Sequence, residues 1–264
     1  MRAASSGSVA KRPILAVVRG WSPFIGLLLA YEVMRDLASF VGLPPHNLGS
    51  LDRALFDGQQ PTILLQAAIG RFADADLIED LASLVYAAHF LLPVVVGVWL
   101  WRRDRHTFTV FGLALLILCG LAFGTYVLAP TIPPWLADPA SVQHLVAVAV
   151  QRSRLPDALV WLYSHHDYNL YAAFPSLHAG FPAVAAMIAV RRSRRVAGLL
   201  ALWAVVVWVV VVYLGEHYVV DVVGGIAYAA IAVAIASVVA NRMRGRRTWQ
   251  SHSLGSRGGG SPNS

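Results

Sequence analysis

The strongest constraint on this chain is the run of residues 199–214, which is apolar throughout and contains no charged side chain. Such a run has no polar face to turn toward water, so lipid or protein must surround it. Similar blocks recur, and about twenty apolar residues cross a hydrocarbon core of roughly 30 Å. Composition agrees, because 57% of the 264 residues are hydrophobic and only 13% are charged. The chain is predicted to be an all-α, polytopic membrane helical bundle, which excludes a soluble, disordered or nucleic-acid-binding protein.

Six transmembrane helices are predicted. Arg19 and Pro23 interrupt the first, for which a cleaved signal peptide is the competing interpretation; the late apolar run and the missing small-x-small cleavage site favour a retained helix. We expect one integral membrane domain over residues 1–250, with catalytic motifs in 172–225, and a disordered Gly/Ser-rich tail over 251–264. The predicted spans are Leu15–Met34, Leu81–Trp101, Thr107–Ala129, Ala172–Val190, Val196–Leu214 and Tyr218–Ala240.

Clusters of basic residues predict the orientation of the six spans. They place most of the 21 basic residues on one side of the membrane, together with only Asp104 of the 14 acidic residues. The positive-inside rule makes that side, and both termini, cytoplasmic. The net charge of +7 therefore indicates topology rather than a nucleic-acid partner. The clusters are Lys11–Arg12, Arg102–Arg105, Arg191–Arg195 and Arg242–Arg247.

The long connections 35–80 and 130–171 then lie outside, with the turn at Gly215–Glu216, and the active site is expected on this non-cytoplasmic side of the plasma membrane. The single cysteine, Cys119, lies within an apolar run, so no disulfide framework or cysteine metal site is expected.

Three ionisable residues stand out at the outer helix ends: His178, His217 and Asp221. Such a residue within a span costs about 3 kcal/mol at the helix centre, so each is a functional candidate. His217 and Asp221 are one helical turn apart, so the carboxylate can orient the imidazole; capping of span six by an interfacial pair is the plain structural alternative. His178 reaches the same surface, because the intervening chain forms one helical hairpin.

The residues before His178 read as a helix start. Pro175 suits the first turn, and Ser176 can cap the helix. Free backbone N–H groups at such an end, together with the helix dipole, favour a phosphate group.

Residues 174–179, which read FPSLHA, and residues 213–221, which read YLGEHYVVD and precede Gly224–Gly225, resemble the second and third signature motifs of the type 2 phosphatidate phosphatase superfamily. The resemblance covers the last four spans. It implies a membrane helical bundle and metal-independent phosphoryl transfer. His217 would be the nucleophile that forms a phosphohistidine, Asp221 would orient it, and His178 would protonate the leaving alkoxide. Ser176, with Pro175 and Gly215 in the same motifs, would lie at the phosphoryl oxygens.

Two departures from the family pattern concern cations. Val210 and Val211 stand where the third motif usually has Ser-Arg, and the first motif, Lys and Arg followed by Pro, is absent in recognisable form. Candidates that could replace these cations, each of them more readily explained as a solvated loop residue, are Arg53, Arg71, Arg152, Arg154, His165 and His166.

Other residues resemble the inositol phosphorylceramide synthase-like branch. They are Tyr126, Pro130–Trp135, His89 and the segment from Asn169 to His178. A Pro-rich turn with an interfacial Trp, and an interfacial histidine, are the plain alternatives. The branch transfers a phospho-alcohol headgroup from a phospholipid to a lipid hydroxyl, so Tyr126 and Asn169 are expected to bind substrate.

The function expected is therefore phosphoryl transfer at the outer leaflet from a phospholipid or polyprenyl phosphate to a lipid alcohol, with phosphatase activity as the alternative. A proton-coupled transporter would place ionisable residues at mid-depth in several spans, and a non-catalytic assembly protein would make the paired histidines accidental. A vanadate-dependent peroxidase shares the histidine motif but needs cationic ligands. The sequence indicates no metal and no organic cofactor, and it does not reveal the oligomeric state.

Overall fold

A computed structural model describes residues 21–22, 26, 43–152, 155–158, 160–161 and 170–255, with only the backbone for residues 90 and 246–255. The first predicted span, 15–34, lies outside the described residues except for Trp21, Ser22 and Gly26. Asn169 also lies outside them.

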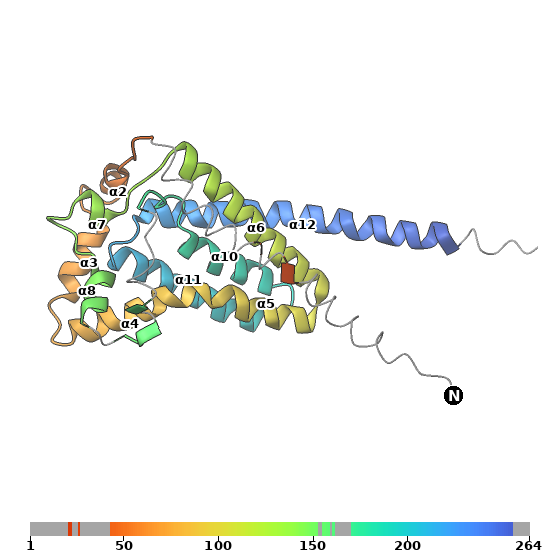
Figure 1. Ribbon diagram of the computed structural model, residues 1–264, viewed down its shortest axis with the longest axis horizontal. Helices are drawn as coiled ribbons and strands as arrows, with labels where there is room; N and C mark the ends of the chain where they lie inside the picture. Colours follow the sequence, from red (N-terminus) through yellow and green to blue (C-terminus); the bar gives the residue numbers. More distant parts are fainter. Residues whose placement is uncertain are drawn as a thin grey trace, which may run out of the picture.

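The regular structure of the described residues is helical, which confirms the predicted all-α class. Long helices lie side by side, and short ones gather at one end of the bundle (Figure 1). The helices are α2 (Gly49–Leu55), α3 (Pro61–Ile69), α4 (Ala75–Ala87), the 3-10 helix η1 (Ala88–Phe90), α5 (Leu92–Arg103), α6 (Arg105–Leu128), α7 (Pro134–Ala137), α8 (Leu145–Gln151), α10 (Leu177–Ala189), α11 (Arg194–Tyr213) and α12 (Val219–Gly255).

Three helices of the described chain are long and apolar enough to cross a membrane: α6, α11 and the part of α12 over Val219–Gly245. The pair α4 and α5, bent by 47° at its break, can form a fourth span. These correspond to the predicted second, third, fifth and sixth spans. The six-span count and the cytoplasmic position of the termini stay predictions.

The fourth predicted span corresponds to α10, which begins at Leu177, later than the predicted Ala172. The reason is that the preceding segment is extended and bonded elsewhere. Thr131 donates its backbone N–H to the Tyr171 carbonyl at 3.1 Å, and its own carbonyl accepts from the Ala173 N–H at 3.2 Å. The result is a helix of only 13 residues.

The long helices leave large apolar side chains on their outer faces, as lipid-facing helices do. On α11 these exposed residues follow the helical repeat, and α12 carries a second set on its own outer face. The exposed residues are Leu199, Leu202, Val205, Val206 and Val209 on α11, and Val223, Ile231, Ile235 and Val238 on α12. The protein is thus an integral membrane protein by the character of its helices.

Small residues bring α10, α12 and α6 close together. A Cβ at Gly225 of α12 would lie 2.2 Å from the Ser176 carbonyl oxygen, and one at Gly180 of α10 would lie 2.9 Å from Cδ2 of Leu118. Close backbone approach of this kind is how helices pack in membranes, where apolar burial gives little driving force. The contact presses the N-terminal ends of α10 and α12 against each other, and these ends carry the predicted site.

Hydrogen-bonding side chains mark where several helices begin. Ser176 accepts from the Ala179 N–H at 3.2 Å before α10, and Ser193 accepts from the Val196 N–H at 3.3 Å before α11. Asp104 does the same for α6, accepting from the N–H of His106 at 2.9 Å. Each satisfies a backbone donor that has no partner within the helix.

Candidate active site

The imidazoles of His178 and His217 lie next to each other at one end of the bundle, with ring centroids 5.6 Å apart. His178 is near the start of α10, and His217 lies in the turn between α11 and α12. The two side chains come together because α10 and α11 form an antiparallel hairpin. α11 therefore ends at the same end of the bundle where α10 begins, and the turn with His217 follows it. The sequence prediction that both histidines share one end of the bundle agrees with this geometry.

Asp221 stands behind His217. Its Oδ2 lies 3.5 Å from Nδ1 of His217 and accepts a hydrogen bond from the Tyr218 N–H at 2.8 Å. The carboxylate is fully buried, so the backbone bond fixes its position. With Nδ1 of His217 turned toward this carboxylate, Nε2 is the nitrogen available for chemistry.

Polar atoms without partners gather at this place. Among the described residues, Nε2 of His178, Nδ1 of His217 and Oδ1 of Asp221 are buried and make no hydrogen bond. Buried polar groups are normally satisfied, and an exception calls for an explanation. Nδ1 of His217 faces the Asp221 carboxylate at 3.5 Å, whereas Nε2 of His178 is the atom of this group that an oxygen of a ligand could meet.

Ser176 and Pro175 connect the two helix ends. The Ser176 N–H donates to the Asp221 carbonyl at 3.0 Å, so α10 and α12 are hydrogen-bonded through their first residues. The Tyr126 hydroxyl of α6 donates to the Pro175 carbonyl at 2.7 Å, and Phe174 donates its N–H to Thr131 Oγ1 at 2.7 Å. Tyr126 therefore holds the backbone that precedes His178.

Gly215 shapes the turn that carries His217. Its φ of +83° is one that residues with side chains rarely adopt, and a Cβ there would lie 2.8 Å from the Gln143 carbonyl oxygen. Its own carbonyl accepts from the Trp135 N–H at 3.2 Å. Gln66 of α3 fastens the same turn, donating to the carbonyls of Gln143 at 2.9 Å and Tyr213 at 3.0 Å.

A second polar group adjoins the histidines, and the sequence did not predict it. Glu216 is 8% exposed; its Oε1 lies 2.9 Å from Nε2 of His144, and its Oε2 accepts from the Tyr86 hydroxyl at 3.5 Å. Tyr86 stacks on His178, with ring centroids 4.1 Å apart, so Glu216 is connected to His178 through Tyr86 and precedes His217 in the chain.

Aromatic contacts complete this group. Trp135 of the Pro-rich turn stacks on His144 at 4.1 Å, with the ring planes 3° apart. His89 lies 4.1 Å from the ring of His178 and 4.7 Å from that of Phe181. Two of the features that resemble the synthase-like branch, the Pro-rich turn and His89, therefore belong to the surroundings of the site.

Asp52 of α2 holds the N-terminus of α12. Its carboxylate is fully buried and accepts hydrogen bonds from the N–H groups of Val219 at 2.9 Å and Val220 at 3.0 Å. Burial raises the pKa of Asp52, against the lowering effect of these two bonds. Next to it, the Tyr218 hydroxyl donates to Asn47 Oδ1 at 2.8 Å. No sequence motif pointed to α2, because the partners of Asp52 are backbone groups.

The cations that could replace the missing motif arginines are in part engaged elsewhere. Arg152 forms an ion pair with Asp76 at 3.2 Å and a closer one with Glu79, and Arg53 donates to Gln60 Oε1 at 3.2 Å. Arg71 is exposed. Arg154, His165 and His166 lie outside the described residues. Within the described chain, no group of three or more His, Cys, Asp or Glu side chains is arranged to hold a metal ion.

The bundle and its buried histidines define a membrane protein equipped for phosphoryl transfer at one end of its helices. The family model of the PAP2 superfamily matches residues 54–235, and the chain belongs to this superfamily. It is therefore an enzyme of the phosphatase or phosphotransferase type, acting on lipid phosphates.

A curated relative is the phosphoinositol dihydroceramide synthase of Bacteroides thetaiotaomicron. It is 25% identical over 245 residues, which cover 86% of this chain and 79% of the relative. No solved structure matches the chain significantly.

Proposed function

We propose that the protein moves a phospho-headgroup from a phospholipid to a lipid alcohol through a phosphohistidine on His217. The observation that carries this proposal is the pair of histidines 5.6 Å apart, with the Asp221 carboxylate behind one of them. One imidazole can act as nucleophile while the other handles the proton of the leaving or entering oxygen.

In the first step, Nε2 of His217 attacks the phosphorus of the donor lipid. An N–P bond forms, the P–O bond to the diacylglycerol breaks, and the proton on Nε2 of His178 goes to the leaving alkoxide. His178 enters this step as imidazolium and leaves it neutral. Asp221 stabilises the positive charge that develops on His217.

In the second step, the hydroxyl of the lipid alcohol attacks the same phosphorus. The new O–P bond forms, the N–P bond breaks, and the hydroxyl proton returns to His178. Both histidines are then in their starting states. With water instead of the alcohol, the same chemistry hydrolyses the intermediate, which is the phosphatase alternative.

Positioning and charge neutralisation supply most of the rate in phosphoryl transfer. We propose that the N-terminal end of α10, with Ser176 at its cap, lies at the phosphoryl oxygens, and that Gly215 and Pro175 set the backbone around them. Asn169 is proposed to contact the headgroup. Arg71, Arg154, His165 or His166 are the remaining candidates for the missing cations.

The Bacteroides relative supports transfer over hydrolysis, because its name is that of a synthase. It favours an inositol phospholipid as donor and a ceramide-type alcohol as acceptor for this chain. We propose that residues 1–250 form one domain and that the site faces the non-cytoplasmic side of the plasma membrane.

The test uses the full chain purified in detergent with a chelator. Phosphatidylinositol labelled in the inositol ring is supplied with a ceramide-type alcohol, and labelled phosphatidic acid is supplied separately. Label on the acceptor lipid is the expected result, whereas free phosphate from phosphatidic acid alone would identify a phosphatase. Inositol label bound to protein through phosphorus, stable in base and lost in acid, would mark the phosphohistidine.

The matched variants are His217→Asn and His106→Asn. His106 is a histidine at the other end of the bundle, where Nε2 lies 3.2 Å from Asn241 Oδ1. We expect His217→Asn to abolish both transfer and the protein-bound label, and His106→Asn to leave both intact. Full transfer by His217→Asn would refute the assignment of the nucleophile.

A further inference from the structure

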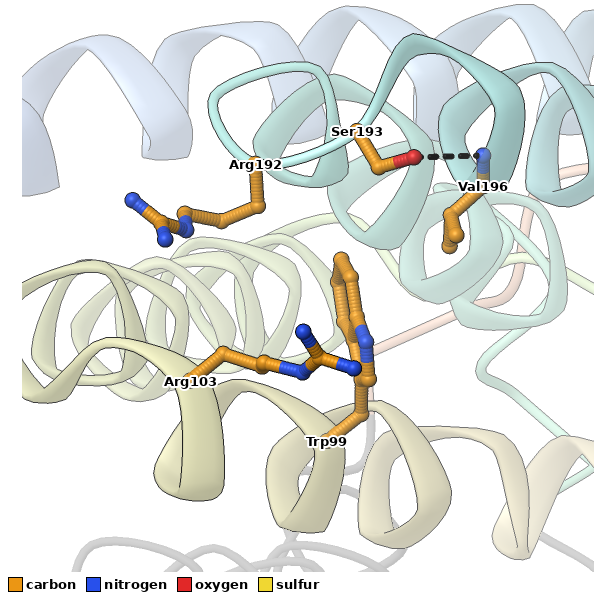
Figure 2. A pocket seen from close by; sticks show the side chains of 5 residues that line it. All are labelled: Trp99, Arg103, Arg192, Ser193 and Val196. Atoms are coloured by element: carbon orange, nitrogen blue, oxygen red, sulfur yellow. Dashed lines mark hydrogen bonds between the residues drawn. The ribbon is translucent and has the colours of Figure 1, made fainter.

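A cavity of about 280 Å³ lies at the end of the bundle opposite the histidines, where α5 ends and α11 begins. Trp99 and Arg103 contribute from α5; Arg192, Ser193 and Val196 face them from the turn into α11 (Figure 2). The length of α10 separates this cavity from His178, so it is not part of the site described above.

The two arginines of the cavity have little internal compensation. Among described residues, Arg103 forms no ion pair, and Arg192 approaches only Asp104, at 3.5 Å, with side chains 40% and 28% exposed. Asp104 is committed to α6, where its Oδ1 accepts the His106 N–H and its Oδ2 accepts the Thr107 hydroxyl at 2.8 Å. The cavity therefore presents two guanidinium groups, of which only that of Arg192 lies near a carboxylate.

The surroundings add more positive charge. Arg102, Arg194 and Arg195 are exposed beside the cavity, and the N-terminal end of α11, capped by Ser193, points its helix dipole the same way. Asp104 is the only acidic residue among positions 92–137 and 177–215, which include the whole cavity. An anion entering here meets attraction from several directions.

The other components of the cavity are apolar. The Trp99 indole and Val196 line it, and Trp99 lies one helical turn before the end of α5. Tryptophan is enriched where lipid headgroups meet acyl chains. A volume of about 280 Å³ suits a phosphate ester headgroup rather than a whole lipid.

We infer that this cavity binds the phosphate of an anionic phospholipid from the arginine-rich leaflet, with Arg103 and Arg192 as paired ligands and Trp99 beside the glycerol. Guanidinium groups bind phosphate oxygens through charge-assisted hydrogen bonds and often in pairs. Basic pockets between helices at the membrane surface bind such headgroups. Free inorganic phosphate shares this chemistry, and the experiment separates the two sources.

The experiment counts bound lipids on the delipidated full chain by native mass spectrometry. Phosphatidylglycerol is compared with phosphatidylcholine, whose headgroup carries no net charge. The pocket variant is Arg103→Gln with Arg192→Gln, and its matched control is Arg102→Gln with Arg195→Gln. The control removes the same charge from the same two segments without touching the cavity lining.

We expect the wild type and the control to hold one phosphatidylglycerol per chain more than the pocket variant, whose affinity for that lipid falls about tenfold. We expect that inorganic phosphate does not displace the bound lipid. Displacement would make free phosphate the ligand and overturn the assignment to a lipid. Equal losses in the two double variants, or no preference over phosphatidylcholine, would overturn the site itself. Lipid binding is read independently of transfer, so failure here leaves the function proposed for His217 untouched.

Discussion

The Asp52 carboxylate accepts a hydrogen bond from the Val219 N–H at 2.9 Å, although 167 positions separate the two residues in the chain. This contact joins α2 to α12, the helix that carries Asp221. Together with the bond from Val220, it gives two otherwise unpaired donors of α12 a charged acceptor. The direction of α12, and with it the position of Asp221 behind His217, depends on a residue that touches neither side chain.

Replacement of Asp52 should impair catalysis without removing any reacting group. We expect Asp52→Ala to lower kcat roughly a hundredfold, since a displacement near 1 Å can cost that much. Asp52→Asn keeps one acceptor oxygen and should retain an intermediate rate. Steady-state transfer assays would separate kcat from KM, and Asp74→Asn, an exposed carboxylate of the same outer region, serves as the control. Equal rates for the alanine and wild-type proteins would contradict a positioning role.

A methyl group at Gly225 should force α10 and α12 apart. Because its Cβ would lie 2.2 Å from the Ser176 carbonyl oxygen, Gly225→Ala cannot be accommodated by rotating a side chain. We expect a loss of about 1–3 kcal/mol in stability, typical of overpacking, and reduced transfer activity. Gly120→Ala on α6, whose Cβ would meet nothing within 4 Å, is the matched control. Thermal unfolding in detergent distinguishes the two, and identical midpoints would argue against the close contact.

The effect of His178→Gln should depend on the leaving group. A general acid contributes roughly 10²–10⁴-fold when the leaving oxygen is a poor one, so transfer from a natural diacylglycerol donor should fall by about that factor. A phosphodiester with a nitrophenol leaving group needs no proton and should lose much less. His217→Asn should inactivate the enzyme toward both substrates. Parallel losses for the two substrates in His178→Gln would show that His178 is not the acid.

Asp104, which lies at the end of the bundle opposite the histidines, should make the stability of the folded protein depend on pH. Burial opposes its ionisation, but hydrogen bonds from Thr107 and His106 and the charge of Arg192 hold the pKa of Asp104 below its ordinary value. Its contribution is therefore complete above that value, about 3.9, and is lost as pH falls through the lower pKa of the folded protein.

The measurement is the unfolding midpoint between pH 7 and 3. Asp104→Ala should cost about 1 kcal/mol at pH 7, as loss of a helix cap does, and the difference from wild type should shrink as the pH falls below about 4. Asp104→Asn keeps the cap without a titratable group, so its difference from Asp104→Ala should not change with pH. A gap between wild type and Asp104→Ala that widens toward acid would contradict the shift.

Much of the site could be predicted from the sequence because its chemistry is local. His217 and Asp221 are one helical turn apart, and Ser176 and His178 belong to the start of one helix, so helical geometry alone brings each pair together. The hairpin of α10 and α11 then fixes which ends meet. The apolar blocks predicted the long helices for the same reason, since their length and lack of charge leave few alternatives.

The other residues around the candidate site were not predicted, because their partners are far away in the sequence. Asp52 bonds to backbone N–H groups, which leave no trace in the sequence of their partners. His144 reaches Glu216 from a segment between spans, where no periodic pattern fixes the fold. Glu216 had one usable signal, its position beside His217. The predicted start of the fourth span at Ala172 was wrong, because backbone hydrogen bonds to Thr131 hold residues 171–173 in an extended conformation.

The shortness of α10 decides how deep the reaction takes place. Thirteen residues rise about 20 Å, whereas the hydrocarbon core is roughly 30 Å thick. α10 ends directly before Arg191 and Arg192, and placing these arginines at one headgroup plane would put His178 roughly 10 Å beneath the other. At that depth a donor headgroup would have to move toward the acyl region, where bulk water is scarce. The depth of the site would then favour a lipid alcohol over water as the group that attacks the phosphohistidine.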